Sequence, residues 1–198
     1  MKIISINIGQ IALHKDPFSP RKAYPSAIHK LPVSSLEKPK VLCARYMGLE
    51  GDQQADQRVH GGSDKAIYAY PFEHYSFWTA LVQAQSLDQA PTSLEYGHLG
   101  ENLTVSGLLE HDVWVGDLWF IGDLELRVTK LREPCFKFNA KMDDPDAGKT
   151  MLKTAKSGWY LKVLKEGEIK AGDPIKVVPG PRKLSIKDQN DALLKKRA

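Results

Sequence analysis

Short apolar stretches that follow one another at close intervals constrain the fold of this chain most strongly. Turn-forming residues separate them, among them Gly-Asp pairs at 116–117 and 122–123, and the same pair recurs at 172–173. Gly and Asp favour turns, and strands this close together leave no room for crossover helices. The pattern therefore predicts a β-barrel or β-sandwich instead of an alternating βα sheet. The predicted strands of this region are residues 102–105, 113–115, 118–121 and 125–130.

Outside this region the sequence predicts further strands and a few helices. Apolar stretches bounded by glycine, proline or polar residues predict strands at residues 3–8, 26–31, 41–49, 66–70, 159–164 and 175–178. Polar segments predict loops at residues 14–25 and 32–39, which are rich in proline, and a turn at 143–148. Helical spacing or a capping box predicts helices at residues 71–84, 136–142 and 185–196. We expect a mostly β domain over residues 1–180 and a helical tail over 181–198.

Composition narrows the classes of protein to which the chain can belong. Its 198 residues suffice for one domain with a substantial core, and its net charge is only +4. Apart from a C-terminal cluster its cations are scattered, which favours an anionic small molecule over nucleic acid as a ligand. Two cysteines cannot build a disulfide framework, a structural zinc site or a four-cysteine iron–sulfur cluster. No apolar run is long enough for a signal peptide or membrane helix, so we expect a cytoplasmic protein.

One of the two cysteines lies in an unusual setting. Cys135 follows Pro134, with Arg132 three residues before it and Lys137 two residues after it. Proline resists helix, so the cysteine is predicted to lie in a turn at the end of a strand. The two cations favour the thiolate, which is the form that attacks electrophiles or binds metals. The alternative is a small buried core residue, which is what we expect of Cys43 inside its predicted strand.

A second unusual segment runs from residue 48 to residue 62. It is polar, it is punctuated by glycines, and it is too long for a tight turn. Long ordered loops in compact domains tend to be functional. The adjacent Gly61 and Gly62 follow His60, and glycines allow a backbone to approach a ligand closely or to adopt positive φ angles. The segment is therefore a candidate part of a binding site.

Four sequence blocks, in this order and spacing, resemble the MOSC-domain family, named after the C-terminal domain of molybdenum-cofactor sulfurase. The resemblance extends over about residues 2–178 and is greatest to the bacterial stand-alone branch that reduces N-hydroxylated bases. It implies a MOSC-type β-barrel that holds a molybdenum–pterin cofactor. The blocks are Gly48-Leu49-Glu50-Gly51-Asp52, Val59-His60-Gly61-Gly62 with Lys65 and Ala66, Gly100-Glu101-Asn102-Leu103, and Arg132-Glu133-Pro134-Cys135.

The resemblance implies a role for each of several residues. Cys135 matches the family's cysteine, a thiolate ligand of molybdenum, and soft sulfur suits that metal. Asn102 is expected to hydrogen-bond the pterin ring. His60 and Glu101 are candidate proton donors, although Glu101 could instead be a structural partner of a buried cation. The candidate contacts of the cofactor's phosphate are Arg132, Lys137, Lys65 and the backbone of His60, Gly61 and Gly62.

The reaction implied by the resemblance is the reduction of an N–OH group to an amine. Because the chain lacks iron–sulfur capacity and a dinucleotide motif, its electrons are expected from a separate flavin reductase or ferredoxin-like protein. The other expected partners are the N-hydroxylated substrate and a second copy of the chain in a homodimer. Longer members of the branch follow the barrel with a helical domain, of which this chain has about one helix. Two alternatives remain: a sulfur-transfer enzyme with a persulfide on Cys135, and a non-catalytic carrier of the cofactor.

Overall fold

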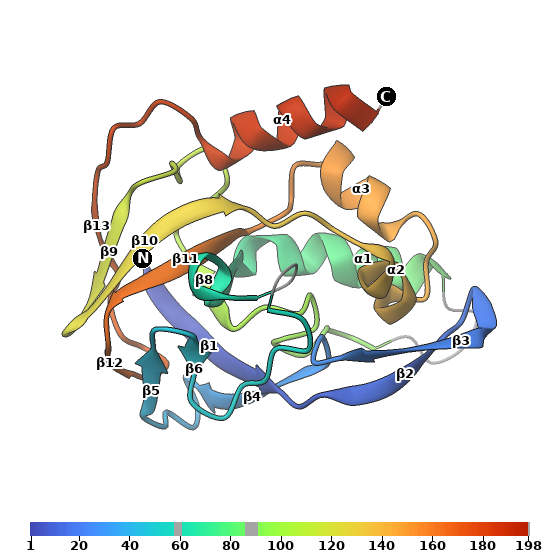
Figure 1. Cartoon of the computed structure of the whole chain (residues 1–198), viewed down its shortest axis with the longest axis horizontal. Coiled ribbons are helices and arrows are strands. Elements are labelled where there is room, and N and C mark those ends of the chain that lie inside the picture. Colours follow the sequence, from blue (N-terminus) through green and yellow to red (C-terminus); the bar gives the residue numbers. More distant parts are fainter. Residues whose placement is uncertain (58–60, 86–90, 198) are drawn as a thin grey trace.

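The computed structural model describes residues 1–57, 61–85 and 91–197, and its centre is a strongly curled sheet (Figure 1). Eight strands form it in the order β13-β9-β10-β11-β7-β8-β1-β4, and only the β7–β8 pair is parallel. The strands of this sheet are β1 (Lys2–Gly9), β4 (Lys30–Ser35), β7 (Ile67–Pro71), β8 (Leu103–Ser106), β9 (Leu118–Ile121), β10 (Leu124–Leu131), β11 (Trp159–Lys165) and β13 (Lys176–Val178). The predicted fold class, mostly β with a barrel-like sheet and a few helices, is confirmed.

Two apolar clusters lie on the two faces of this sheet. The larger fills the inside of the curl and includes the fully buried Ile3, Trp119 and Trp159. The smaller packs helices against the outside, with Trp78 of α1 (Tyr75–Gln85) against Phe138 of α2 (Phe136–Met142). Burying this much apolar surface fixes the position of α2. That helix directly follows Cys135.

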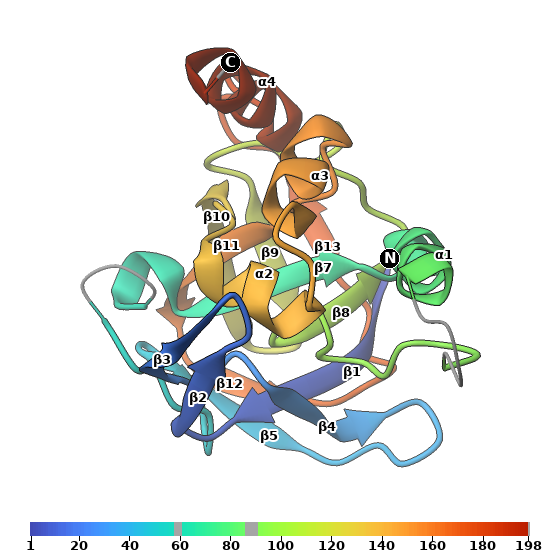
Figure 2. The same ribbon diagram turned by 90° about the vertical axis from the view of Figure 1, so that its right-hand side faces the viewer.

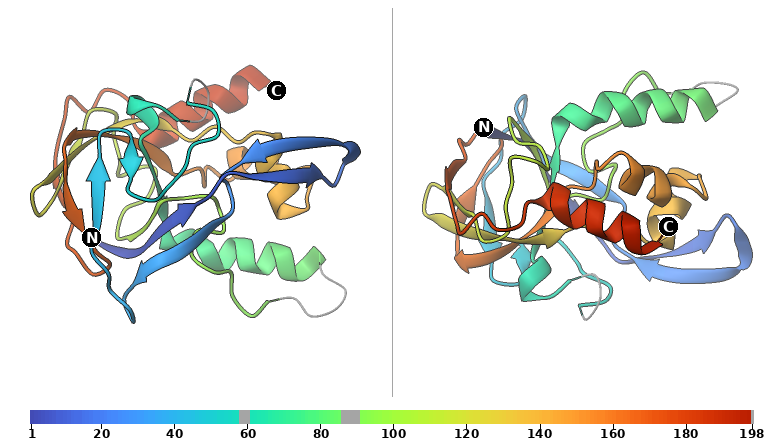
Figure 3. Two further views of the ribbon diagram at one scale, coloured as in Figure 1. Left: turned by 60° about the horizontal axis from the view of Figure 1, so that its bottom comes forward. Right: turned by 90° about the horizontal axis from the view of Figure 1, so that it is seen from above.

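The segment predicted as a loop at residues 14–25 is a hairpin instead. Strands β2 (Ala12–Asp16) and β3 (Ser19–Ser26) pair only with each other and extend from the barrel toward α2 (Figures 2 and 3). The second predicted loop, residues 32–39, begins with the last residues of β4. Both segments contain prolines, which argued against strands. Strands with an unpaired edge tolerate proline, because a missing N–H costs no ladder hydrogen bond there.

The strand predicted at residues 41–49 is two short strands joined by a turn. Strands β5 (Leu42–Arg45) and β6 (Gly48–Leu49) form a separate sheet with β12 (Gly167–Ile169). Alternation along β5 buries Ala44 completely and leaves Cys43 half-buried, so the prediction of Cys43 as a core residue is wrong. A hydrogen bond to Glu50 raises the pKa of the Cys43 thiol, which therefore stays protonated at neutral pH.

Three further predictions differ from the structure. The strand predicted at residues 26–31 is the end of β3 and the start of β4, and residues 27–29 between them form no strand. Residues 113–115 form no strand and make only a bridge between Trp114 and Ser185. The turn predicted at residues 143–148 ends early, because helix α3 (Ala147–Lys153) begins inside it. Met151 and Leu152 of α3 are buried, and this packing compensates for the glycine at its second position.

Helix α4 (Ile186–Arg197) lies across the top of the barrel in Figure 1. The side-chain carbonyl of Gln189 accepts a hydrogen bond from the Leu131 amide at 2.7 Å, at the end of β10. The amide of the buried Asn190 donates to the Leu152 carbonyl of α3 at 2.7 Å. Helix α4 thereby holds both the strand and the helix that lie next to Arg132.

The predicted capping box at the start of α4 is present. The Ser185 hydroxyl accepts a hydrogen bond from the Asp188 amide at 3.0 Å, and the Asp188 carboxylate accepts one from the Ser185 amide at 2.9 Å. We expect Ser185→Ala to lower the free energy of unfolding by about 1 kcal/mol, because an amide at the helix start loses its partner. Urea denaturation measures this change. Lys195→Ala, near the other end of α4, is the control, and an equal loss in both variants would contradict the assignment.

Candidate functional site

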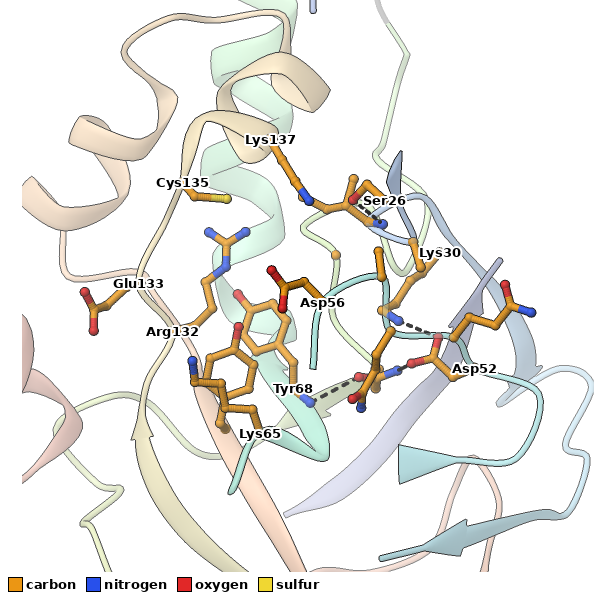
Figure 4. Close-up of a pocket in the computed structure, with 18 residues that line it drawn as sticks. Ser26, Lys30, Asp52, Asp56, Lys65, Tyr68, Arg132, Glu133, Cys135 and Lys137 are labelled. Carbon is orange, nitrogen blue, oxygen red and sulfur yellow. Dashed lines mark hydrogen bonds and ion pairs between the residues drawn. The ribbon is translucent and has the colours of Figure 1, made fainter. Parts of the chain in front are cut away.

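An open pocket lies at one end of the barrel, between the start of α2, the end of β10 and the β3–β4 connection (Figure 4). Its space, including the part of the mouth that is open to solvent, is about 710 Å³. Five of the predicted site residues line it: Lys65, Asn102, Arg132, Cys135 and Lys137. They come from segments far apart in the sequence, and the fold brings them to one cavity.

Cys135 lies at the start of α2, in a backbone conformation that its neighbours explain. Its φ of −129° and ψ of 175° are extended, as is usual for the residue immediately before the first turn of a helix. The side chain is half-buried and faces the pocket (Figure 4). Cys135 thus lies shortly after the end of β10, as predicted, but in an extended segment that leads into α2 and not in a turn. Cys135 does not fill space in the core, which was the alternative hypothesis.

Arg132 is the most deeply buried cation of the pocket. The residue is only 5% exposed, and its guanidinium lies 4.5 Å from the centre of the Phe138 ring and 5.5 Å from that of Tyr68. Its Nη1 atom also lies 3.2 Å from the sulfur of Met151. Within the described part of the chain, no carboxylate forms an ion pair with it. A buried guanidinium with this environment is suited to an anion that enters the pocket.

Two lysines add positive charge to the same wall. The Lys137 amine donates to the Pro25 carbonyl at 3.0 Å, which ties α2 to the β2–β3 hairpin. The Lys65 amine lies 5.9 Å from the centre of the Tyr160 ring. Burial and the nearby charge of Lys130 lower the pKa of Lys65. This wall thus combines a thiol with three cations, and the carboxylates of Asp56 and Glu133 also line the pocket.

The glycines of the long loop do not line the pocket directly. Gly62 donates its amide to the side-chain carbonyl of Gln54 at 2.9 Å, and Gln54 is a lining residue. A side chain at Gly61 would collide with Gln54, which explains this glycine by close packing. Direct contact of Gly61 and Gly62 with a phosphate stays a prediction. His60 lies outside the described residues.

The amide of Asn102 is already engaged on several sides. Its Nδ2 donates to Asp52 at 2.9 Å and to the Asn7 carbonyl at 3.3 Å, and its Oδ1 accepts from the Tyr68 amide at 3.2 Å. Both N–H donors are therefore used within the protein. A contact between Asn102 and a pterin ring stays a prediction, and only the second lone pair of Oδ1 is left to make it.

Glu101 is completely buried and does not line the pocket. Its Oε1 accepts hydrogen bonds from the Tyr75 hydroxyl, from Thr104 at 2.8 Å and from the Gly97 amide at 2.9 Å. These contacts fix the turn that precedes β8. Its predicted role as a proton donor stays a prediction, and its hydrogen bonds favour the structural role.

Sequence reasoning missed a buried ion pair in the opposite wall of the pocket. The Lys30 amine lies 2.5 Å from Oδ1 of Asp52, and the two side chains are 8% and 3% exposed. Asp52 belongs to a block that carried the family resemblance, but Lys30 belongs to no motif. The two residues are 22 positions apart and meet only in the folded chain, so no local signal could have found Lys30.

Lys141 was missed as well. Its amine donates to the carbonyls of Ile28 at 2.9 Å and Gly97 at 3.0 Å, which joins the end of α2 to two loops beside the pocket. Burial lowers its pKa to about 7, and the charges of Lys30 and Arg132 act in the same direction. Burial and the charge of Lys141 also lower the pKa of His98 to about 4.

The lowered pKa of Lys141 makes the free energy of unfolding depend on pH. Its pKa is 10.5 in the unfolded chain and about 7 in the fold, so the unfolded state binds more protons between these pH values. The free energy of unfolding therefore rises with pH in this window. We expect Lys141→Met to remove a rise of about 2 kcal/mol between about pH 7 and 9. Urea denaturation across this range tests it, and parallel pH profiles of the two proteins would contradict it.

This arrangement defines a class of protein: a curled β domain that can hold an anionic ligand beside a thiol. The chain belongs to the MOSC-domain family, whose sequence model matches residues 56–176. The predicted family membership is confirmed. MOSC domains are related to the molybdenum-cofactor sulfurase, so membership associates the chain with the chemistry of that cofactor.

Individual relatives agree with this membership. The chain is 38% identical over 155 residues to the protein YiiM of Escherichia coli (strain K12), which covers 78% of this chain and 64% of YiiM. It is 35% identical over 135 residues to a protein of Gibberella moniliformis named "Reductase", which covers 68% of this chain and 23% of the relative. The chain thus spans less than two thirds of the length of these relatives.

A solved structure extends the similarity to the whole fold. The crystal structure of YiiM from Geobacillus stearothermophilus superposes with a TM-score of 0.75 at 31% identity, over 99% of this chain and 85% of that one. None of the described helices is long and apolar enough to cross a membrane.

Proposed function

We propose that the chain is a molybdenum-cofactor-binding oxidoreductase that reduces N-hydroxylated compounds, such as hydroxylamino bases, to amines. The observation that carries this proposal is the pairing of Cys135 with Arg132 in one pocket. A buried guanidinium without a carboxylate partner among the described residues needs an anion, and a thiol beside it offers a soft metal ligand. The cofactor carries both a phosphate and a soft metal centre.

The residues of the pocket fit this cofactor by their chemistry. The Cys135 thiolate would bind the metal, and Arg132, Lys137 and Lys65 would bind the phosphate. The described residues contain no group of three or more His, Cys, Asp or Glu side chains able to hold a metal ion. The pterin's dithiolene sulfurs would add further soft ligands to a metal that Cys135 binds.

When bound, the cofactor supplies the two-electron redox chemistry, and the chain supplies binding, orientation and protons. The overall reaction joins an N-hydroxylated compound with two electrons and two protons and releases the amine and water. Two cysteines are too few for a four-cysteine iron–sulfur cluster, so we expect the electrons from a separate reductase. A flavin reductase or a ferredoxin-like protein is the expected class of donor.

Elemental analysis and turnover test the proposal together. Protein purified from a host that makes the cofactor is expected to contain about one molybdenum per chain. With a chemical reductant such as reduced methyl viologen, it is expected to convert N-hydroxycytosine to cytosine. A chain without molybdenum that carries a stable added sulfur on Cys135 would instead support sulfur transfer. Stoichiometric molybdenum without turnover on any N-hydroxylated compound would support a carrier.

A further inference from the structure

The wall of the pocket opposite Cys135 contains a charged pair that the proposed function has not used. Figure 4 shows Lys30 and Asp52 on the side that faces Arg132 and Cys135. Their side chains are 8% and 3% exposed, and Nζ of Lys30 lies 2.5 Å from Oδ1 of Asp52. Burying two charges costs free energy that their mutual attraction alone rarely repays. The remaining hydrogen bonds of the pair therefore decide whether it is satisfied.

Asp52 is fully satisfied within the protein. Its Oδ1 accepts from the Lys30 amine and from the Gly9 amide at 2.7 Å, and its Oδ2 accepts from Asn102 at 2.9 Å. Lys30 is not satisfied. An ammonium has three N–H donors, and Asp52 is the one acceptor that the described residues provide. Two donors of a desolvated amine thus remain for a group in the pocket.

The charges around Lys30 indicate what kind of ligand group accepts its two remaining hydrogen bonds. Asp52 neutralises Lys30, and the carboxylate of Asp56 also lines the pocket, so Lys30 contributes no net positive charge here and favours an uncharged acceptor over a second anion. The opposite wall, with Arg132, Lys137 and Lys65, takes the anion. Beside Lys30 the pocket is lined by Ala27, Ile28 and Gly100, which offer an apolar surface to a flat ring.

We propose that Lys30, held by Asp52, forms a second subsite that binds an uncharged ring through its carbonyl or ring-nitrogen acceptors. The inference rests on the proposed function in one respect: the ring belongs to the pterin or to the N-hydroxylated base. The shared chemistry of the two is a planar heterocycle with adjacent acceptor atoms. Lys30 would then donate hydrogen bonds to the ring, as Arg132 would donate them to the anion.

Binding measurements on the metal-free chain of residues 1–198 test this subsite and separate the two sources. Isothermal titration calorimetry compares three probes: hydroxymethylpterin, N-hydroxycytosine and inorganic phosphate. Lys30→Met/Asp52→Asn removes the ammonium without leaving an unpaired buried carboxylate. We expect this variant to bind one of the two rings about tenfold more weakly or worse, and to bind phosphate as the wild type does. The affected ring identifies the occupant.

The matched control is Lys187→Met/Asp191→Asn, which removes an exposed Lys–Asp pair at 2.6 Å on α4. It is expected to leave all three affinities unchanged. Circular dichroism verifies that both double variants are folded. If Lys30→Met/Asp52→Asn is not folded, it is replaced by Lys30→Gln, which removes the charge but keeps an N–H donor for Asp52, and the same ring is expected to bind more weakly. The inference is wrong if neither ring binds the wild type, if the ring affinity is unchanged, or if phosphate binding falls equally.

The outcome is independent of the test of the proposed function. Suppose that the chain holds molybdenum and reduces N-hydroxylated compounds, but that the Lys30 variant binds both rings as tightly as the wild type. In that case only the inferred subsite is wrong. If Lys30 controls ring binding in a chain that never holds molybdenum, only the proposed function is wrong.

Discussion

Cys135→Ser is expected to abolish molybdenum retention and to reduce turnover of N-hydroxylated compounds at least about a thousandfold, as the loss of an essential catalytic group does. A serine hydroxyl stays protonated at neutral pH and is a hard, weak ligand for a soft metal. Elemental analysis of purified protein and a single-turnover assay measure the two effects. Cys43→Ser is the control, because Cys43 lies on β5, outside the pocket, and its pKa is raised. Both quantities should be unchanged in this control.

The same substitution should have little effect on the fold. Cys135 is half-buried and serine has nearly the same volume, so we expect the free energy of unfolding to change by about 1 kcal/mol or less. If Cys135→Ser retained full molybdenum and full turnover, the thiolate would not be the metal ligand.

Arg132→Met is expected to weaken phosphate binding by the chain about 10- to 100-fold. The reason is that a hydrogen bond to a charged group contributes about 1.5 to 3 kcal/mol in a buried site. Arg132→Lys keeps the charge but loses the two parallel donors, so an intermediate affinity is expected. Calorimetric titration with inorganic phosphate measures these affinities. Arg45→Met, which removes an exposed arginine paired with Glu166, is the control.

Arg132→Met should weaken phosphate binding without a comparable loss in the free energy of unfolding. The guanidinium is buried without a carboxylate partner among the described residues, and methionine can fill the space between Phe138 and Tyr68. We expect the free energy of unfolding to change by about 1 kcal/mol or less, since the lost ring contacts offset a relieved desolvation cost. A large loss of stability with unchanged phosphate affinity would show that Arg132 is a structural residue.

Much of the fold could be predicted, because the local sequence pattern of these elements agrees with the environment that they have in the folded protein. The strand at residues 124–131 is bounded by a Gly-Asp turn and by Pro134, and the capping box of α4 needs only Ser185 and Asp188. The hairpin of β2 and β3 was missed because Pro20 and Pro25 are strand residues only where an edge is unpaired. That condition depends on the rest of the fold, which a local pattern cannot supply.

Some residues of the candidate site could be predicted from local sequence, and others could not. Cys135, Arg132 and Lys137 are close in sequence, so their clustering can be recognised from the order of residues alone. Lys30 and Lys141 carry no motif, and their importance comes from burial and from partners far away in the chain. A lysine in a sequence is most often a solvated surface residue, so only its surroundings in the fold mark these two as different.

The hydrogen bond from the Leu131 amide to Gln189 bears on how the protein is made in the cell. The residue that follows Leu131 is Arg132, so the anion site is fixed in part by a helix at the far end of the chain. During synthesis that helix leaves the ribosome after every strand of the barrel. We therefore expect a ribosome-stalled chain that lacks residues 186–197 to bind phosphate poorly, and cofactor insertion to wait until α4 has formed.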